Sequence, residues 1–507
     1  MRRTCWRTFA SAIVTLSLMS VGCGSKKGTS DGTGAGGATG GSGGAAGASA
    51  GGAGDASGNA GTGGAAGGSG TGGATGGATG GTTGGAAGGA TGGTMGTAGA
   101  GGSVAAWSGT RILGTSAHDL MSGLAIDASG NIYIHGETGG ALYGQTQGAM
   151  YDLFALKLNA AGAVQWAAQI AGAGLEQAGA LALDRTGNVY ITGSTYTSID
   201  SRPSAGGFDV VLVKLDSSGA QQWIRQFGST GFDYAEGVVT DAAGNVYVAG
   251  KVGDALPGST SLGYDDAFLV KFDSAGTQQW ARQFGTAAAQ FVSDLAIDAS
   301  GNLYVAGYAS DPSGTLANAP EVGHVFLAKY DGAGTPQWTR IVASSGGERP
   351  DSVGTDVAGN VYVVGVTTGD FGGSGNAGNG DGFVIKYDGA GNQVWARQLG
   401  TAKSDEAHAV TTDAAGNVYV GGSTYGGFDT PPTGGISVAF VAKYDSAGTR
   451  AWLRQTPMNA SHVSSVAVDP RGDVFISGRS DNAVDGVPGL GADDIFVMKY
   501  SADGVKY

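Results

Sequence analysis

The sequence predicts an all-β fold over residues 104–507, a seven-bladed β-propeller with four antiparallel strands in each blade. Three features predict it: a motif that recurs about every 57 residues, four short strand signals within each recurrence, and one Trp per recurrence. The motif reads Asp-x-x-Gly-Asn-x-Tyr, and its copies begin at Asp127, Asp184, Asp241, Asp298, Asp356 and Asp413, with a degenerate copy at Asp469. A fixed period of this size indicates a repeat architecture in which each unit packs on its neighbours.

Residues 237–285 show how one unit is built. A first strand ends at Asp241, and in the Asp-x-x-Gly-Asn turn that follows, Asp can hydrogen-bond the backbone two residues on while Gly accepts the positive φ that such hairpins need. A second strand follows at 246–250, then a variable loop, a third strand at 268–273 and a fourth at 279–285. Short strands without a helical period indicate an all-β unit, and four such strands repeated radially make a propeller blade.

The Trp positions give the number of blades and the way the ring closes. The seven Trp of the repeats are Trp107, Trp166, Trp223, Trp280, Trp338, Trp395 and Trp452. Trp107 precedes the first motif, and no Trp follows the seventh, so the strand near Trp107 is expected to complete the last blade. Closure of this kind removes exposed sheet edges.

The Gly-Asn-x-Tyr-Val-x-Gly and Asp-x-Phe-x-x-Lys-Tyr-Asp runs resemble the SBBP repeats of bacterial envelope and secreted proteins, a seven-bladed β-propeller family. The resemblance covers about 104–507. It implies a propeller but no single activity. The seventh copy departs from the pattern at Asp473 and Phe475, and the second has Val211 in place of Phe. Neither departure threatens the predicted fold.

Residues 1–22 are interpreted as a lipoprotein signal peptide. Arg2, Arg3 and Arg7 form a basic start, and the apolar run that follows is too short to span a membrane. The run ends at Cys23 in a sequence that resembles a bacterial lipobox, which implies that Cys23 is lipidated, although Ser20 stands where the motif has Leu. Gly24 after the Cys is compatible, by the rule of that family, with sorting to the outer membrane. The alternative is a plain signal peptide with an incidental Cys.

Residues 23–103 form the second segment, the lipidated Cys followed by a low-complexity linker rich in Gly, Ala, Thr and Ser. Such a composition does not bury enough apolar surface to fold, so we predict a disordered tether. A flexible chain of this length has an average span of roughly 50 Å. We therefore expect a propeller held off a bacterial outer membrane, on the periplasmic face or the cell surface.

The formal net charge is −14, and the basic start and linker make the propeller itself still more acidic. This excludes nucleic acid as a natural partner of the domain and leaves the lipid as its only membrane contact. One Lys on each third strand, such as Lys271, and an Arg two residues after most Trp, such as Arg282, recur with the repeat. Because they recur, we interpret them as structural: the Lys as a partner of turn Asp residues, the Arg as a stack on Trp or an ion pair.

The loop between the second and third strands varies most between repeats, and such loops carry specificity on rigid scaffolds. Carboxylates there are candidate binding or calcium residues, because Ca²⁺ prefers flexible loops with oxygen ligands. The candidates are Asp200, Asp254, Asp311, Asp370, Asp381, Asp429, Asp481 and Asp485. No stretch matches a known calcium motif, so polar turn chemistry is the alternative, and no cofactor is predicted.

Two principal readings of function follow. The five His are scattered without metal-ligand spacing, and no nucleophile or phosphate-binding motif is present, which favours a non-enzyme. The first reading is an envelope lipoprotein with a monomeric propeller that binds a protein or a glycan. The alternative is a polysaccharide-active hydrolase or lyase with its site on the loop face, which needs unique acidic or His residues that converge there. A quinoprotein-like propeller and a purely structural role are further alternatives.

Overall fold

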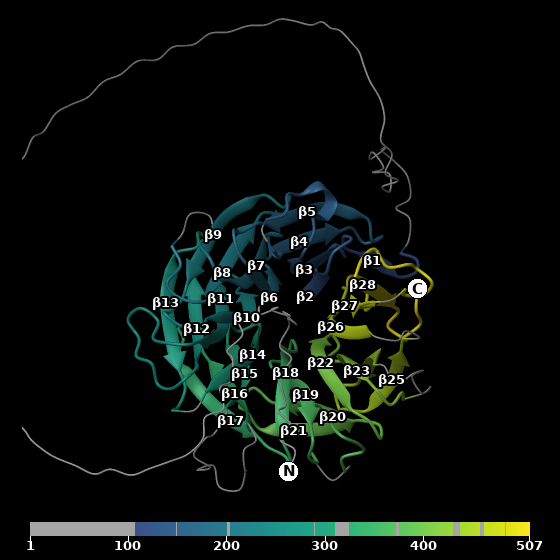
Figure 1. Cartoon of the computed structure of the whole chain (residues 1–507). Helices are drawn as coiled ribbons and strands as arrows, with labels where there is room; N and C mark the ends of the chain where they lie inside the picture. The colour runs from purple at the N-terminus through teal and green to yellow at the C-terminus, as the bar shows by residue number, and fades with distance from the viewer. Residues whose placement is uncertain are drawn as a thin grey trace, which may run out of the picture. The chain divides into compact units, whose positions relative to one another are not determined.

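The computed structural model describes residues 107–148, 150–199, 203–287, 289–309, 324–371, 375–428, 437–456, 461–481 and 483–507. The chain divides into two compact units, 1–96 and 97–507, and every described residue belongs to the second. Figure 1 shows this unit as a ring of seven four-stranded sheets around a central axis. The predicted seven-bladed propeller is confirmed. Cys23 and the linker lie outside the described residues.

Each blade is an antiparallel sheet in which consecutive strands pair. The first three blades contain β2 (Asp119–Ile126), β3 (Ile132–Thr138), β4 (Asp152–Leu158) and β5 (Val164–Ile170); β6 (Glu176–Leu183), β7 (Val189–Thr195), β8 (Asp209–Leu215) and β9 (Gln221–Phe227); and β10 (Tyr234–Thr240), β11 (Val246–Val252), β12 (Asp266–Phe272) and β13 (Gln278–Phe284). Blade four contains β14 (Gln290–Ile297), β15 (Leu303–Ala309), β16 (His324–Tyr330) and β17 (Pro336–Val342). A short 3-10 helix, Leu142–Gly144, lies in the loop after β3.

The other three blades follow the same plan. They contain β18 (Glu348–Thr355), β19 (Val361–Thr367), β20 (Asp381–Tyr387) and β21 (Gln393–Leu399); β22 (Asp405–Thr412), β23 (Val418–Thr424), β24 (Val438–Tyr444) and β25 (Arg450–Gln455); and β26 (Ser461–Val468), β27 (Val474–Ser480), β28 (Asp494–Tyr500) and β1 (Arg111–Leu113). The first strand of each blade lies nearest the axis and the fourth lies at the rim (Figure 1).

The ring closes through β1, which pairs antiparallel with β28 as its fourth strand. Trp107 lies just before β1, is 5% exposed and meets the ring of Phe475 edge-on at 5.5 Å. The expectation that the strand near Trp107 completes the last blade is therefore confirmed. The seventh blade joins residues from both ends of the propeller sequence.

The Asp of each repeat motif organises the turn between the first and second strands. In the third blade Asp241 Oδ1 accepts from the backbone N–H of Ala243 and of Asn245, at 2.9 Å each. Its Oδ2 accepts from Asn245 Nδ2 at 2.7 Å and from the Tyr247 hydroxyl at 3.0 Å. Gly244 has φ +79°, a conformation that only Gly adopts without strain. The motif is thus a structural turn, as the sequence indicates.

The recurring Lys and Arg join each blade to the next. Lys271 Nζ lies 4.9 Å from the centre of the Tyr247 ring, 4.0 Å from Asp241 Oδ2 and 3.3 Å from Gly332 O of the next blade. Arg397 stacks on Trp395 at 5.4 Å, while its Nε donates to Gly448 O at 2.7 Å. The predicted Arg–Trp stack is confirmed. The Lys partners are aromatic rings and carbonyls more than turn carboxylates, because each Nζ sits over the motif Tyr or Phe.

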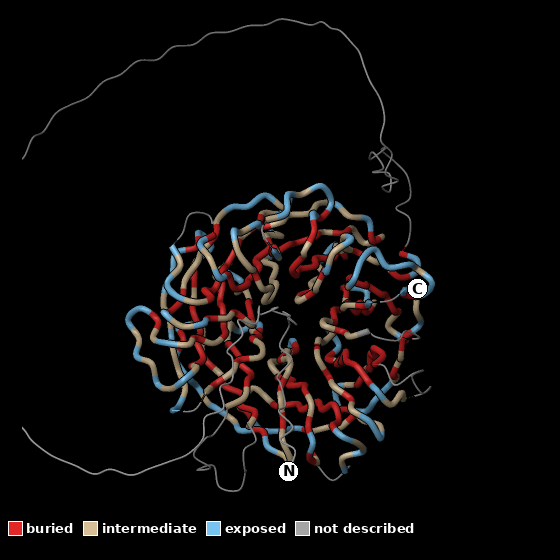
Figure 2. Tube along the Cα trace, in the orientation of Figure 1, coloured by how far each residue is buried: buried red, intermediate tan, exposed pale blue. Residues whose placement is uncertain are grey.

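The core lies in the middle of each blade, where Figure 2 shows the buried positions between an exposed rim and the axis. The motif Tyr residues, such as Tyr247 and Tyr362, are at most 1% exposed, and Val and Ile from the second and third strands surround them. Burial of these side chains is the main stabilising term, at about 25 cal/mol per Å² of apolar surface. Within the described residues, no helix is long and apolar enough to cross a membrane.

Candidate functional site: an axial pocket

The first strand of each blade carries a β-bulge, seen as a shift in its register with the second strand. In each of these strands, one equivalent residue lies in the bulge, near the axis. These residues, one per blade, are Ser122, Gly179, Glu236, Ser293, Asp351, His408 and Ser464. Bulges often re-aim side chains at functional sites. Here a position held in register by the fold bears residues that differ from blade to blade.

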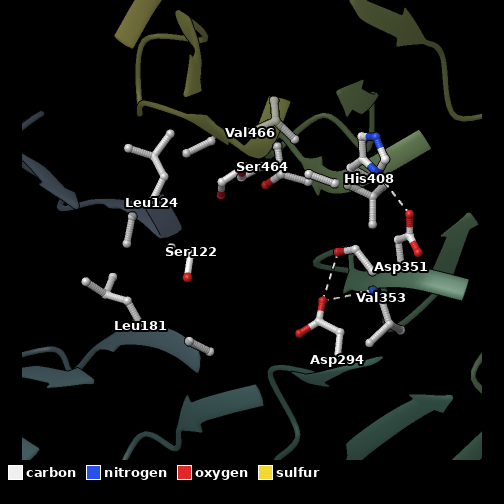
Figure 3. Close-up of a pocket in the computed structure, with 18 of the residues that line it drawn as sticks. Ser122, Leu124, Leu181, Asp294, Asp351, Val353, His408, Ser464 and Val466 are labelled. Carbon is white, nitrogen blue, oxygen red and sulfur yellow. Dashed lines mark hydrogen bonds and ion pairs between the residues drawn. The ribbon is translucent and has the colours of Figure 1, made fainter. Parts of the chain in front are cut away.

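These residues line a pocket of about 440 Å³ at the centre of the ring. Figure 3 shows Ser122, Asp294, Asp351, His408 and Ser464 around one common space, with apolar side chains between them. The pocket is rich in hydroxyl and carboxyl groups. Such a lining provides hydrogen-bond donors and acceptors for a polar ligand, and the seven packed innermost strands hold these groups in fixed positions.

Four charged or titratable side chains of β18 and β22 meet on one side of the axis. We call Arg349, Asp351, Glu406 and His408 the axial cluster. His408 Nδ1 lies 2.9 Å from Asp351 Oδ2, and its Nε2 lies 2.9 Å from Ser423 Oγ. Arg349 Nη2 donates to Glu406 Oε2 at 3.0 Å and to Asp351 Oδ2 at 3.3 Å. The imidazole is therefore held between an acid and a hydroxyl, with a guanidinium beside it.

Two further acids of the pocket have raised pKa values. Burial raises the pKa of Asp294 to about 6, although Val353 N–H at 3.0 Å and Ser352 Oγ at 2.8 Å both donate to its Oδ2. Burial also raises the pKa of Glu236 to about 7; the Lys251 ammonium opposes this rise and the Asp294 carboxylate adds to it. Carboxyl groups with pKa values near neutrality in a cavity are able to exchange protons with a ligand.

His462 extends this group of side chains into the seventh blade. Its ring centre lies 6.1 Å from that of His408. Burial, together with the nearby His408 and Arg479, lowers the pKa of His462 to about 4. A neutral imidazole therefore stands at this edge of the cluster at neutral pH.

Among the described residues, the pocket can hold a cation through one set of ligands. Asp351, Glu406 and His408 each offer an atom within 4.8 Å of the others, and all three are partly exposed. Arg349 already bridges the two carboxylates, and a guanidinium in this place competes with a metal ion. The set is therefore better suited to hydrogen bonding than to metal binding.

The structure does not bring the predicted loop carboxylates together. Asp200, Asp311 and Asp429 lie outside the described residues. Asp254 is exposed and accepts from Thr230 Oγ1 at 2.6 Å, which is turn chemistry. Asp370 accepts from Gly375 N at 3.1 Å within its own loop. Asp481 is exposed after β27, and Asp485 accepts from Thr110 and Lys506. Only Asp381, the first residue of β20, is buried.

The axial pocket was missed by reasoning from the sequence. Its signal is present, however: when the seven repeats are aligned, the bulge position bears Ser, Gly, Glu, Asp and His in place of one recurring residue. His408 and Asp351 are unique in this register. His408 and Asp351 lie at the axis, whereas the enzyme alternative drawn from the sequence places its unique acidic or His residues on the loop face.

The seven sheets and their axial pocket define the class of protein, a seven-bladed β-propeller. The sequence model of the SBBP β-propeller repeat matches the chain in three places, residues 222–251, 279–312 and 394–429. The family resemblance expected from the motifs is thus confirmed.

Two curated proteins give the level of similarity beyond the repeat. The regulatory protein FlaEY of Caulobacter vibrioides is 28% identical over 62% of this chain and 37% of its own length. An uncharacterized WD repeat-containing protein of Acanthamoeba polyphaga mimivirus is 23% identical over 31% of the chain and 14% of its own length. The chain thus spans little more than a third of the first relative and about a seventh of the second.

Solved structures similar to the chain have low sequence identity. An ulvan lyase of polysaccharide lyase family 25, with bound saccharide, is 10% identical with a TM-score of 0.45 and covers 78% of this chain and 98% of its own. The hydrazine synthase of Kuenenia stuttgartiensis is 10% identical with a TM-score of 0.46 and covers 72% of this chain and 94% of its own.

Proposed function

We propose that the protein is a lipid-anchored envelope protein whose propeller binds a glycan or a protein through the axial pocket. One observation carries the proposal. The seven bulge positions have the same backbone place in every blade, yet they bear Ser, Gly, Glu, Asp and His. A structural role predicts one residue type at all seven, as the repeat shows for Lys and Tyr. Different residues at equivalent positions suit an asymmetric ligand.

The chemistry of the lining favours a ligand rich in hydroxyl groups. Hydroxyls and carboxylates converge at the pocket beside the His408 imidazole, and these hydroxyls and carboxylates are able to donate to or accept from a sugar. A glycan chain, or a polar loop of a partner protein, fits this description. The acidity of the domain argues against an anionic polymer such as nucleic acid.

The test of binding uses the purified full chain and two variants of the same blade. Isolated envelope polysaccharides and a glycan array serve as probes, and calorimetry measures affinity. His408→Asn is expected to weaken binding about tenfold or more, since a charge-assisted hydrogen bond is worth about 1.5–3 kcal/mol. The control is Asp445→Asn, a half-buried turn residue whose side chain accepts from the backbone N–H of Ala447 and of Thr449. Equal losses in both variants, or no loss in either, would contradict an axial ligand site.

Anchoring through Cys23 is the second part of the proposal. It rests on the basic and apolar residues before Cys23 and on the low-complexity linker after it. Stable anchoring takes more than one acyl chain, as a diacylated Cys provides. Wild-type chain is expected to incorporate labelled palmitate and to fractionate with the outer membrane, and Cys23→Ser is expected to do neither. A labelled Cys23→Ser chain would refute lipidation at this residue.

A specific observation favours a second candidate function, a polysaccharide-active enzyme. Asp294 and Glu236 have pKa values raised to about 6 and 7, and the His408–Asp351 pair lies in the same pocket. Proton transfer by such groups is the chemistry of glycoside hydrolases and lyases. A screen of polysaccharides for turnover tests it. Glu236→Gln and Asp294→Asn should each abolish turnover while preserving binding.

A further inference from the structure

Adjacent blades meet at the loop face in the same way at most junctions. At these junctions two strand starts lie side by side. One is the start of the innermost strand of a blade, and the other is the first residue of the third strand of the preceding blade. A backbone hydrogen bond fixes this: the N–H of the innermost-strand residue donates to the carbonyl just before the third-strand residue. These bonds are Asp119 N to Asp493 O at 3.0 Å, Glu176 N to Tyr151 O at 3.3 Å, Asp233 N to Phe208 O at 2.7 Å and Asp405 N to Gly380 O at 2.8 Å.

At four of the seven junctions both residues so placed are acids. The four inter-blade carboxylate pairs are Asp152 with Glu176, Asp209 with Asp233, Asp381 with Asp405, and Asp494 with Asp119. All eight side chains are buried, none more than 2% exposed. No ion pair among the described residues involves any of them. Two adjacent buried carboxylates without a counter-charge are costly, because a low-dielectric interior disfavours both charges.

Each third-strand Asp of the four pairs uses only one of its two oxygens. In Asp381, for example, Oδ2 accepts from Ala377 N at 2.7 Å and from Gln398 Nε2 at 2.9 Å, whereas Oδ1 has no hydrogen-bond partner. The same unpartnered Oδ1 occurs in Asp152, Asp209 and Asp494, and also in Asp266, which faces Gln290. Buried polar atoms are nearly always satisfied, so these equivalent exceptions indicate a missing ligand, and the four that face a second carboxylate also have the charge to bind a cation.

In two of the pairs the unpartnered oxygen lies close to the other acid. A Cβ added to Gly114 would lie 2.9 Å from Asp494 Oδ1 and 2.8 Å from Asp119 Oδ2. A Cβ added to Gly228 would lie 2.8 Å from Asp209 Oδ1 and would collide with Asp233 Oδ2. Both carboxylates of a pair therefore border one small space, which the glycine leaves free of side-chain atoms.

We propose that the four inter-blade carboxylate pairs are binding sites for Ca²⁺, one ion between the blades at each junction. Two carboxylates supply hard oxygen ligands and neutralise the ion, and nearby loop carbonyls and water can complete a coordination of 6–8 oxygens. Mg²⁺ fits less well, since it dehydrates reluctantly and such buried pairs leave little room for its waters. Each ion would join two neighbouring blades where no strand pairing joins them.

The rival explanation is a proton shared within each pair. Burial does raise the pKa of Glu176 to about 7, which favours its protonated form. A shared proton joins the two carboxyl groups to each other, whereas a cation is bound by both, so the response of the melting temperature to Ca²⁺ and to acid separates the two explanations. A cation also explains why unpartnered oxygens recur at the same atom of four Asp residues.

The other junctions serve as internal comparisons. At the other three junctions, the residues at these positions are Asp266 and Gln290, His324 and Glu348, and Val438 and Ser461. None of these has two carboxylates, so each lacks the charge of the four pairs. We therefore expect about four ions per chain and not seven.

The experiment counts ions on the purified full chain. The protein is treated with EGTA, dialysed against buffered Ca²⁺ at neutral pH, and analysed by plasma mass spectrometry. Calorimetry follows binding, and the melting temperature is measured in Ca²⁺ and in EGTA. We expect about four Ca²⁺ per chain and a melting temperature that falls by several degrees in EGTA and returns with Ca²⁺.

Variants locate the sites. Asp381→Asn combined with Asp405→Asn should lower the count by one ion, and the single variant Asp381→Asn should weaken that site if the double variant does not fold. Asp254→Asn, which changes an exposed carboxylate of a different loop, should keep the full count. No bound Ca²⁺ with equal melting temperatures overturns the proposal, as does a count that the Asp381 variants leave unchanged. A melting temperature that ignores Ca²⁺ but rises on acidification identifies shared protons instead.

Discussion

His408 Nδ1 lies 2.9 Å from Asp351 Oδ2, although the two residues are 57 positions apart, because they occupy the same bulge position of adjacent innermost strands. The Arg349–Glu406 ion pair spans the same separation. One repeat length therefore brings chemically different residues side by side at the axis. This is how a repetitive scaffold produces a site that is not repetitive.

Asp351→Asn tests whether this relationship serves a ligand or only the fold. The change removes the negative charge that Arg349 and His408 share, while an amide oxygen still accepts a hydrogen bond. We expect affinity for the glycan identified by the array to fall about tenfold, with a change in unfolding free energy of about 1 kcal/mol or less. Calorimetry and thermal unfolding measure the two effects. A large loss of stability without loss of affinity would assign the cluster to the fold.

The repeated parts of the molecule were predictable from the sequence and the axial site was not. The turn Asp, the buried Tyr and the Trp–Arg stack recur at one spacing, so each copy of the repeat supports the structural interpretation of the other copies. His408 and Asp351 occur once each in this register, and nothing local shows which residues face them. Their proximity depends on ring closure and on bulges that re-aim single side chains, neither of which periodicity encodes.

Asp241→Ala should destabilise the propeller more than Asp273→Ala. Both residues accept backbone N–H bonds in a turn, but Asp241 also accepts from the buried Tyr247 hydroxyl, whereas Asp273 also accepts from the exposed Gln279. Loss of the Asp241 carboxylate leaves the Tyr247 hydroxyl with only the longer bond to Gly332 O at 3.3 Å, at a cost of about 1–3 kcal/mol beyond the turn itself. Chemical denaturation measures the difference. Equal losses for the two variants would contradict the special role of the motif Asp.

Glu137→Gln should alter how stability depends on pH. Burial raises the pKa of Glu137 to about 7, although Ala178 N–H donates to its Oε2 at 2.7 Å. A carboxyl group with a folded-state pKa above its unfolded value contributes stability that is fully present below about pH 4.5 and is lost as pH rises through about 7. The Gln variant keeps the neutral form at every pH.

The variant is therefore expected to be more stable than wild type at pH 8, by on the order of 3 kcal/mol at most, and similar to it at pH 4.5. Thermal unfolding across this range measures the effect. Asp254→Asn is the control, because hydrogen bonding from Thr230 lowers the pKa of that exposed acid and so gives no gain at pH 8. A wild-type and a Glu137→Gln curve that run parallel from pH 4.5 to 8 would refute the raised pKa.

The loop carboxylates show a second limit of the sequence. Asp254 and Asp381 both belong to acidic loops between a second and a third strand, and composition alone treats them alike. The structure separates them, since Asp254 is exposed in a turn and Asp381 begins a strand beside Asp405. The side chain's position relative to the strand start decides between a solvated turn and a buried pair. That boundary is the least certain feature of a strand read from sequence.

Ring closure by β1 gives the last prediction. Deletion of residues 107–113 removes the three residues that pair with β28 and the buried Trp107 that packs on Phe475. Loss of a buried Trp alone costs about 3–5 kcal/mol, and the unpaired edge of β28 becomes a template for association. We expect a markedly lower melting temperature and concentration-dependent aggregation, seen by light scattering.

A synthetic peptide of residues 104–116, added in excess, should restore part of the melting temperature because it can pair with the open edge. The control is a deletion of residues 24–100, which keeps β1 and should leave the melting temperature unchanged. Equal stability of the two deletion variants would show that β1 is dispensable for the ring.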